Sequence, residues 1–219
     1  MVALIKKQNP DIIALAGDIA DDIEPIEGAE LFLDGIRTIA PVYYVTGNHE
    51  IWSRRTEEIK QVFRNHGVIV LENTYEQVII NDQKFIIGGV DDPDIVPYEK
   101  PDMDWPGEMM NSFSDLKHQS AFTILLSHRP ELIDLYRELP FDVVLSGHSH
   151  GGQVIIPFLL NGLLAPNQGW FPKYAGGLYQ HPEIIHIVSR GVSYNPRLPR
   201  IFNPPEIVAI DINSSGNNH

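Results

Sequence analysis

The chain has 219 residues, of which 43% are hydrophobic and 21% charged, a composition typical of a globular protein with a full hydrophobic core. Its 29 acidic and 16 basic residues give a net charge of -13, which repels nucleic acids, membrane anions and phosphate esters unless a cation intervenes. The absence of cysteine excludes disulfides and thiolate ligands, so any metal ion must be bound through oxygen and imidazole nitrogen.

Short apolar runs alternate with segments of helical period along much of the chain, which predicts buried strands with amphipathic helices between them. We expect strands at residues 12–16, 42–46, 76–80, 84–90, 121–126, 143–145, 184–188 and 206–212. We expect helices at residues 29–40, 56–66 and 130–138. The strands at 76–80 and 84–90, joined through residues 81–83, indicate a hairpin. This order of elements predicts a mixed sheet layered with helices.

Side chains that bind hard or borderline cations follow four of these strands directly. The strands lead into Gly17-Asp18-Ile19-Ala20-Asp21, Gly47-Asn48-His49-Glu50, Ser127-His128 and Gly147-His148-Ser149-His150. Because the carboxyl ends of strands form the ligand crevice of an α/β sheet, we expect the four loops to converge. Four of the nine histidines occupy these positions, which indicates a placement that is not random.

Taken singly, most of these motifs also have a purely structural explanation. A Gly-Asp pair after a strand is often a turn, Asn48-His49 can cap a helix, and a single histidine such as His128 is often an ordinary packing residue. The pair His148 and His150 is more specific, because two imidazoles in one glycine-flanked loop can reach neighbouring metal ions. The combination of all four motifs favours a metal centre.

In this order and spacing, the four motifs resemble those of the calcineurin-like metallophosphoesterases over nearly the whole chain. The stretches Ala165-Pro166-Asn167-Gln168-Gly169 and Arg200-Ile201-Phe202-Asn203 are similar to the bacterial branch of small phosphodiesterases, whose members are often associated with the envelope. The resemblance implies an α/β (α+β) fold, a four-layer αββα sandwich with mixed sheets, in a single domain of residues 1–219. It also implies divalent-metal-dependent hydrolysis of a phosphomonoester or phosphodiester.

The resemblance assigns the metal ligands residue by residue. Asp18 would bridge two divalent ions (Mn, Fe, Zn or Co). Asn48, His128 and His148 would complete the shell of one ion, and His150 would bind the other. The physical chemistry is consistent with this assignment, since two neighbouring ions can ionise a shared water that attacks phosphorus in line.

The resemblance further implies that His49 is the general acid beside the leaving group and that Asp21 supports the site without binding the metal. Two interpretations of Arg129 are open, a contact with phosphate or a surface ion pair. The acidic run at residues 91–94 could help to shape the site, but we expect it to be a solvated turn. Trp170 and Phe171 either line the mouth of the substrate site or pack under a loop.

One motif of the family is absent. An Asp-x-His pair should precede Asp18 by a few tens of residues on a first strand, and the 17 residues before Asp18 contain none. We therefore expect the first strand to be missing and the natural protein to begin about 30–50 residues upstream. We expect one metal ion in this chain and two in the intact protein. A non-catalytic metal-binding scaffold is the alternative function.

The expected partner is a small phosphate ester. The negative charge and the lack of a basic stripe argue against a second alternative, an enzyme that processes long nucleic acids. The uncharged stretch at residues 151–172 is interrupted by three prolines, so it is a poor transmembrane helix. Its apolar residues predict either an interior strand and turn or an apolar surface that favours a lipid-bearing substrate.

Overall fold

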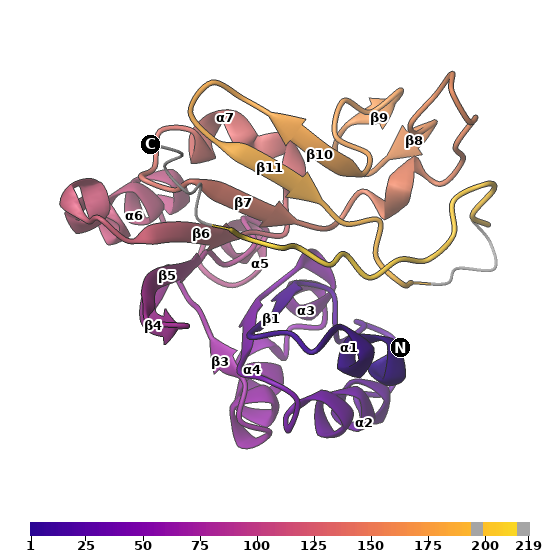
Figure 1. Cartoon of the computed structure of the whole chain (residues 1–219). Coiled ribbons are helices and arrows are strands. Elements are labelled where there is room, and N and C mark those ends of the chain that lie inside the picture. Colours follow the sequence, from indigo (N-terminus) through magenta and orange to yellow (C-terminus); the bar gives the residue numbers. More distant parts are fainter. Residues whose placement is uncertain (194–198, 214–219) are drawn as a thin grey trace.

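The computed structural model describes residues 1–193 and 199–213, which form two facing β-sheets with helices on both outer sides (Figure 1). The first part of the chain contains α1 (Val2–Gln8), β1 (Ile13–Ala16), α2 (Glu27–Ile36), β2 (Val42–Val45), α3 (Asn48–Trp52), α4 (Thr56–Asn65), β3 (Ile69–Val70), β4 (Thr74–Ile80) and β5 (Gln83–Gly89). The middle contains α5 (Ile95–Tyr98), α6 (Trp105–Ser112), η1 (Ser114–His118), β6 (Phe122–Leu126), η2 (Pro130–Leu132), α7 (Ile133–Tyr136) and β7 (Val143–Ser146). The last part contains η3 (His150–Gly152), β8 (Leu164–Ala165), β9 (Gly169–Trp170), β10 (Gly177–Gln180) and β11 (Ile185–Val188).

The smaller sheet has three parallel strands in the order β1-β2-β3. The larger sheet has six strands in the order β10-β11-β7-β6-β5-β4. Its four inner strands are parallel, and an antiparallel strand lies at each edge. The carboxyl ends of β1, β2, β6 and β7 are the ends from which the predicted metal-binding motifs emerge.

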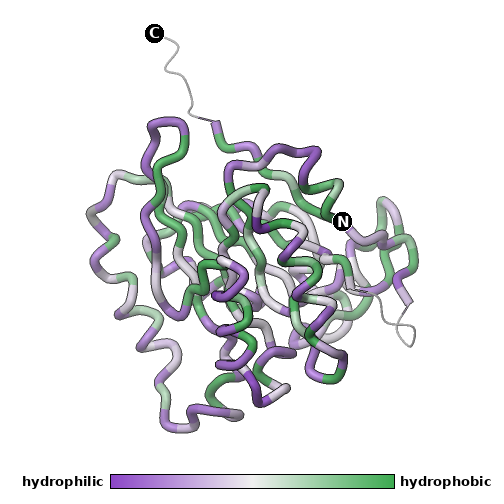
Figure 2. The backbone as a smooth tube through the Cα atoms, turned by 90° about the horizontal axis from the view of Figure 1, so that it is seen from below, coloured by the Kyte–Doolittle hydropathy of each residue, from purple (hydrophilic) through white to green (hydrophobic). Residues whose placement is uncertain are grey.

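Three hydrophobic clusters separate four layers, because successive strand residues face opposite sides of a sheet. In β2, Tyr44 packs against α2 and α4 on the outer side, while Tyr43 and Val45 face the second sheet. The intersheet cluster consists of Tyr43, Val45, Leu71, Ile87, Ile124 and Leu126. A third cluster joins α6 and α7 to the outer side of the larger sheet. Figure 2 shows the hydrophobic stretches concentrated in the interior of the molecule. The predicted four-layer αββα sandwich is confirmed.

Most of the predicted strands are confirmed, with ends shifted by one or two residues. The predicted hairpin is formed by β4 and β5, and its turn is one residue shorter than expected because Gln83 pairs with Ile80. Asn81 and Asp82 form this turn with φ of 49° and 62°, a left-handed conformation that these two residue types tolerate. The predicted helix at 130–138 is divided into η2 and α7.

Two predictions in the last third are wrong. Residues 206–212 do not form a strand, and Glu206 instead binds Arg190 through its side chain. Residues 151–172 do not form an interior strand, because Phe158 and Leu159 are exposed and only the short β8–β9 hairpin is regular. No helix in the described ranges is long and apolar enough to cross a membrane.

Candidate functional site

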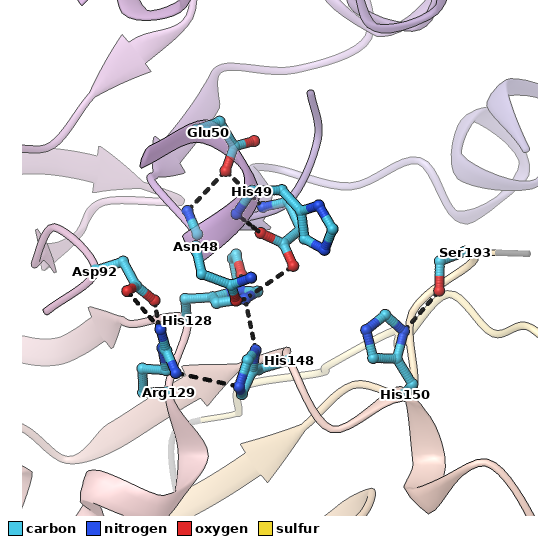
Figure 3. Close-up of polar contacts among 12 residues, drawn as sticks. Asn48, His49, Glu50, Asp92, His128, Arg129, His148, His150 and Ser193 are labelled. Carbon is cyan, nitrogen blue, oxygen red and sulfur yellow. Dashed lines mark hydrogen bonds and ion pairs between the residues drawn. The ribbon is translucent and has the colours of Figure 1, made fainter. Parts of the chain in front are cut away.

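The four predicted motifs meet at the carboxyl ends of the strands, where loops of the two facing sheets converge (Figure 3). Asp18 follows β1 and Asn48 follows β2 in the smaller sheet, while His128 follows β6 and His148 follows β7 in the larger sheet. The backbone N–H of Gly147 donates to the carbonyl of His128 (3.2 Å), which holds the last two loops together. The predicted convergence of the loops is therefore observed.

His128 Nε2 lies at the centre of a cluster of potential ligand atoms. It is 3.1 Å from Asp18 Oδ2, 3.1 Å from Asn48 Oδ1 and 3.1 Å from His148 Nδ1. Ligand atoms bonded to one ion at about 2.0–2.2 Å are about 3.0–3.5 Å from each other. The spacing of these four side chains therefore fits one divalent ion.

The other nitrogen of each imidazole is occupied by a partner that fixes the tautomer. His128 Nδ1–H donates to the carbonyl of Ala16 (2.7 Å), and His148 Nε2–H donates to Asn167 Oδ1 (2.7 Å). Both imidazoles can thus turn a lone pair toward Asp18 and Asn48. Four potential ligand atoms that face one point suit a cation.

The pKa values of the two imidazoles shift in opposite directions. Burial lowers the pKa of His128, but the carboxylate of Asp18 outweighs burial and raises it to about 9. Burial and the neighbouring charges of His128 and Arg129 lower the pKa of His148 to about 3, so this imidazole is neutral at pH 7. A divalent ion would displace the proton of His128 and interact with the same carboxylate.

The two loops of the smaller sheet are held by the buried side chain of Glu50. Its carboxylate accepts backbone N–H groups of both loops, at 2.9 Å from Asp18, 2.7 Å from Ile19, 2.9 Å from Ala20 and 2.8 Å from Gly47. Asp18 has φ of 54°, a left-handed conformation that aspartate tolerates but that is uncommon for residues other than glycine. Glu50 therefore stabilises the backbone that directs the Asp18 carboxylate toward the two histidines.

Arg129 lies behind the cluster and is buried. Its guanidinium binds both oxygens of Asp92 (2.5 and 2.8 Å) and donates to Asn167 Oδ1 (2.7 Å). Asn167 Oδ1 accepts a hydrogen bond from His148 Nε2–H. Arg129 and Asp92 therefore orient this imidazole through the amide of Asn167. The surface ion pair considered for Arg129 is wrong, and so is the solvated turn at residues 91–94, since Asp91 and Asp92 are buried.

His49 lies next to the cluster on α3 and interacts with acidic side chains. Its Nδ1 is 2.5 Å from Asp22 Oδ1 and 3.7 Å from Asp21 Oδ2. Burial lowers the pKa of His49, but Asp18 and Asp22 raise it above its usual value. Asp21 also accepts the backbone N–H groups of Ile23 and Glu24 and so closes the turn after β1.

His150 is set apart from the other predicted ligands (Figure 3). Its Nδ1 is 2.7 Å from Ser193 Oγ, and the described groups of potential ligand atoms within 4.8 Å of one another do not include it. Its role as a ligand of a second ion stays a prediction.

Sequence reasoning identified the side chains of the cluster but missed their supports. Glu50 belongs to the motif Gly47-Asn48-His49-Glu50. Its position three residues after the helix cap Gly47 is a capping signal that could have revealed its role. Asp22 is adjacent to the predicted Asp21. Asp92 and Asn167 carry no local signal, because their partners are distant in sequence. Trp170 and Phe171 are exposed, so the expectation that they pack under a loop is wrong.

Comparison with known proteins points to the same family as the sequence motifs. The sequence profile of the calcineurin-like phosphoesterase family matches residues 1–152. A metallophosphoesterase of Caenorhabditis elegans is 31% identical over a match that covers 96% of this chain and 43% of the relative. YkuE, an uncharacterized metallophosphoesterase of Bacillus subtilis, is 28% identical over 98% of this chain and 72% of its own length. This chain therefore spans less than half of the nematode relative.

A solved structure shares the fold. The NAD nucleotidase of Haemophilus influenzae superposes with a TM-score of 0.55 at 18% sequence identity, over 86% of this chain and 37% of that protein.

The contact between Gly47 and Asp18 makes the site sensitive to one methyl group. A Cβ at Gly47 would lie 2.2 Å from Asp18 Oδ1 and 2.6 Å from its backbone nitrogen, so Gly47→Ala must displace this carboxylate. We expect the affinity for Mn²⁺, measured by isothermal titration calorimetry, to fall at least about tenfold. Gly28→Ala on α2 is the control, because a Cβ there meets nothing within 4 Å. Equal affinity of the two variants would contradict the assignment of Asp18.

Glu50→Gln should lower the free energy of unfolding by about 3 kcal/mol, because the amide group turns a donor toward N–H groups that have lost their acceptor. Urea denaturation followed by circular dichroism measures this loss. The control is Glu58→Gln, whose carboxylate is exposed and binds only Arg55 in the described structure, and which should leave stability nearly unchanged. If Glu50→Gln is as stable as the control, the four backbone hydrogen bonds are not what holds the loops.

Proposed function

The chain belongs to the calcineurin-like phosphoesterase family, and we propose that it hydrolyses a phosphomonoester or phosphodiester with a divalent metal ion bound by Asp18, Asn48, His128 and His148. The observation that carries this proposal is the convergence of Asp18 Oδ2, Asn48 Oδ1 and His148 Nδ1 on His128 Nε2, each at 3.1 Å. Carboxylate, amide and imidazole ligands together suit Mn, Fe, Zn or Co. When bound, such an ion supplies charge that offsets phosphoryl oxygens and lowers the pKa of water.

The residues of the chain contribute orientation and a proton. The Ala16 carbonyl and Asn167 fix the rings of His128 and His148, so that no reorganisation is needed when the substrate enters. His49 is the proposed general acid. Asp22 binds its Nδ1, which leaves Nε2–H as the donor available to a leaving-group oxygen. The acidic neighbours of His49 favour its protonated state.

The alternative function is a metal-binding scaffold without catalysis. One observation favours it, since His150, the predicted ligand of a second ion, lies outside both groups of potential ligands among the described residues and is turned toward Ser193. A chain of this kind would bind one ion per molecule and show no turnover. Metal content and turnover, measured on the same preparation, therefore separate the two functions.

We expect His148→Ala to lose bound metal and His49→Ala to retain it, because only the first variant removes a proposed ligand. In His49→Ala the hydrolysis of alkyl phosphodiesters should fall by about 10²–10⁴, and the hydrolysis of bis(p-nitrophenyl) phosphate much less, because nitrophenolate leaves without a proton. Elemental analysis and steady-state kinetics test both parts.

His66→Ala is the matched control, since this histidine lies at the end of α4 away from the cluster. Equal metal loss in His49→Ala and His148→Ala would contradict the assigned roles. A full complement of metal in the unmodified chain without turnover of either substrate would favour the scaffold.

A further inference from the structure

Three turns near the site present aromatic side chains to solvent. Phe158 and Leu159 lie on one turn, Trp170 ends β9 and Phe171 follows it on a second, and Phe202 lies on a third; we call these five residues the aromatic rim. Phe158 is fully exposed, Trp170 and Phe171 are each 66% exposed, and Phe202 is 74% exposed. Several large apolar side chains exposed together mark an interaction surface.

The backbone of the aromatic rim is strained at the same positions. Phe158, Phe171 and Phe202 have φ of 66°, 58° and 51°, which is unfavourable for bulky residues. Each phenylalanine thus combines an unfavourable backbone conformation with an unburied ring. Strain that brings no gain in packing indicates that the exposed rings have a use outside the core.

The three turns are held together by one short segment of backbone, residues 152–156. Ile201 exchanges hydrogen bonds with Ile155 and Gln153 (2.9 and 3.0 Å), which fixes the Phe202 turn. Leu163 joins the Phe171 turn to Gly152 through hydrogen bonds of 2.8 and 2.9 Å. A bridge between Ile156 and Leu160 closes the Phe158 turn. The three turns are therefore built on one piece of backbone, and Figure 1 shows β8, β9 and their loops projecting beyond the carboxyl end of β7.

The charge near the aromatic rim differs from that of the rest of the chain. The net charge is -13, yet the sequence contains no acidic residue between Asp142 and Glu183. Lys173 is exposed two residues after Phe171, and Arg200 lies two residues before Phe202. The Arg200 guanidinium donates to neutral oxygens of Ser193 and Arg190. Two of the three aromatic turns thus carry a basic neighbour.

From these observations we propose that the aromatic rim docks on the surface of an anionic lipid bilayer. Aromatic side chains at the tips of turns suit the boundary between headgroups and acyl chains, and neighbouring basic residues suit anionic headgroups. The acidic remainder of the chain is repelled by the same surface, which favours one orientation.

Docking in this orientation brings the metal cluster to the lipid surface. Asn203, next to Phe202, donates to the carbonyl of His150 (2.7 Å), and Gln168 in the β8–β9 turn donates to Ser149 (3.1 Å). Asn167, in the same turn, binds His148. The aromatic rim is therefore built on the loop that carries His148 and His150. That lipid phosphate esters are the substrates rests in addition on the proposed function.

Vesicle sedimentation tests the docking directly. Vesicles of phosphatidylcholine with about one third phosphatidylglycerol should bind the unmodified chain at least about tenfold more strongly than pure phosphatidylcholine, because the basic neighbours act only on the first. The double variant Phe158→Ser/Phe171→Ser should lower the partition coefficient at least about a hundredfold, from the lost burial of two rings. Leu31→Ser on α2 removes a similarly exposed apolar side chain at another face and should bind like the unmodified chain.

Fluorescence quenching by brominated lipids locates the contact without a disruptive variant. Of the three tryptophans, Trp105 is buried and Trp170 is the most exposed, so quenching should disappear in Trp170→Phe while sedimentation persists.

Absence of vesicle binding by the unmodified chain, or equal binding by the double variant, would overturn the proposal. A dimer that forms without lipid and dissociates in the double variant would also overturn it, by identifying a second copy as the occupant. None of these readouts needs turnover, so an inactive chain that binds vesicles would refute the proposed function alone.

Discussion

The buried carboxylate of Glu50 joins the loop after β1 to the loop after β2, and the position of the candidate metal site depends on this contact. Four backbone N–H groups from the two loops point at its two oxygens. Burial and the nearby charge of Asp18 raise the pKa of Glu50 to about 6, although the N–H groups of Ala20 and Gly47 oppose the rise. A group that is costly to bury thus fixes the left-handed backbone at Asp18.

A second set of buried charges supports the half of the cluster on the larger sheet. Asp91 binds Lys60, and Asp92 binds Arg129, so each carboxylate of the adjacent pair has its own cation. The Thr46 hydroxyl at the end of β2 donates to Asp91 and accepts the backbone N–H of Asp92. Buried ion pairs add little net stability, because desolvation offsets their attraction. Their contribution here is geometric, since they connect β2 with the groups that orient His148.

The sequence was informative where a residue's environment follows from its neighbours in the chain. Apolar runs predicted β1, β2, β6 and β7, and the polar residues after these strands predicted the cluster. Residues 206–212 are rich in β-branched residues, but no strand in the described ranges accepts them as a partner. The role of Asp92 follows from Arg129, which is distant in sequence. A local pattern indicates which side chains can be buried, whereas the partner of a buried charge is set by the packing of whole layers.

The two histidines of the last motif are held by different parts of the molecule. His148 is bound by Asn167 and lies against His128, at the carboxyl ends of the central strands. His150 is bound through its ring by Ser193 and through its carbonyl by Asn203, both in the last part of the chain. Both histidines have positive φ, 64° and 48°, so neither backbone position is set by local preference. The position of His148 therefore depends on the sheets, while that of His150 depends on the segment that also carries Phe202. Contact of the aromatic rim with another surface could displace that segment. Such a displacement would act on His150 before it acts on the cluster around His128.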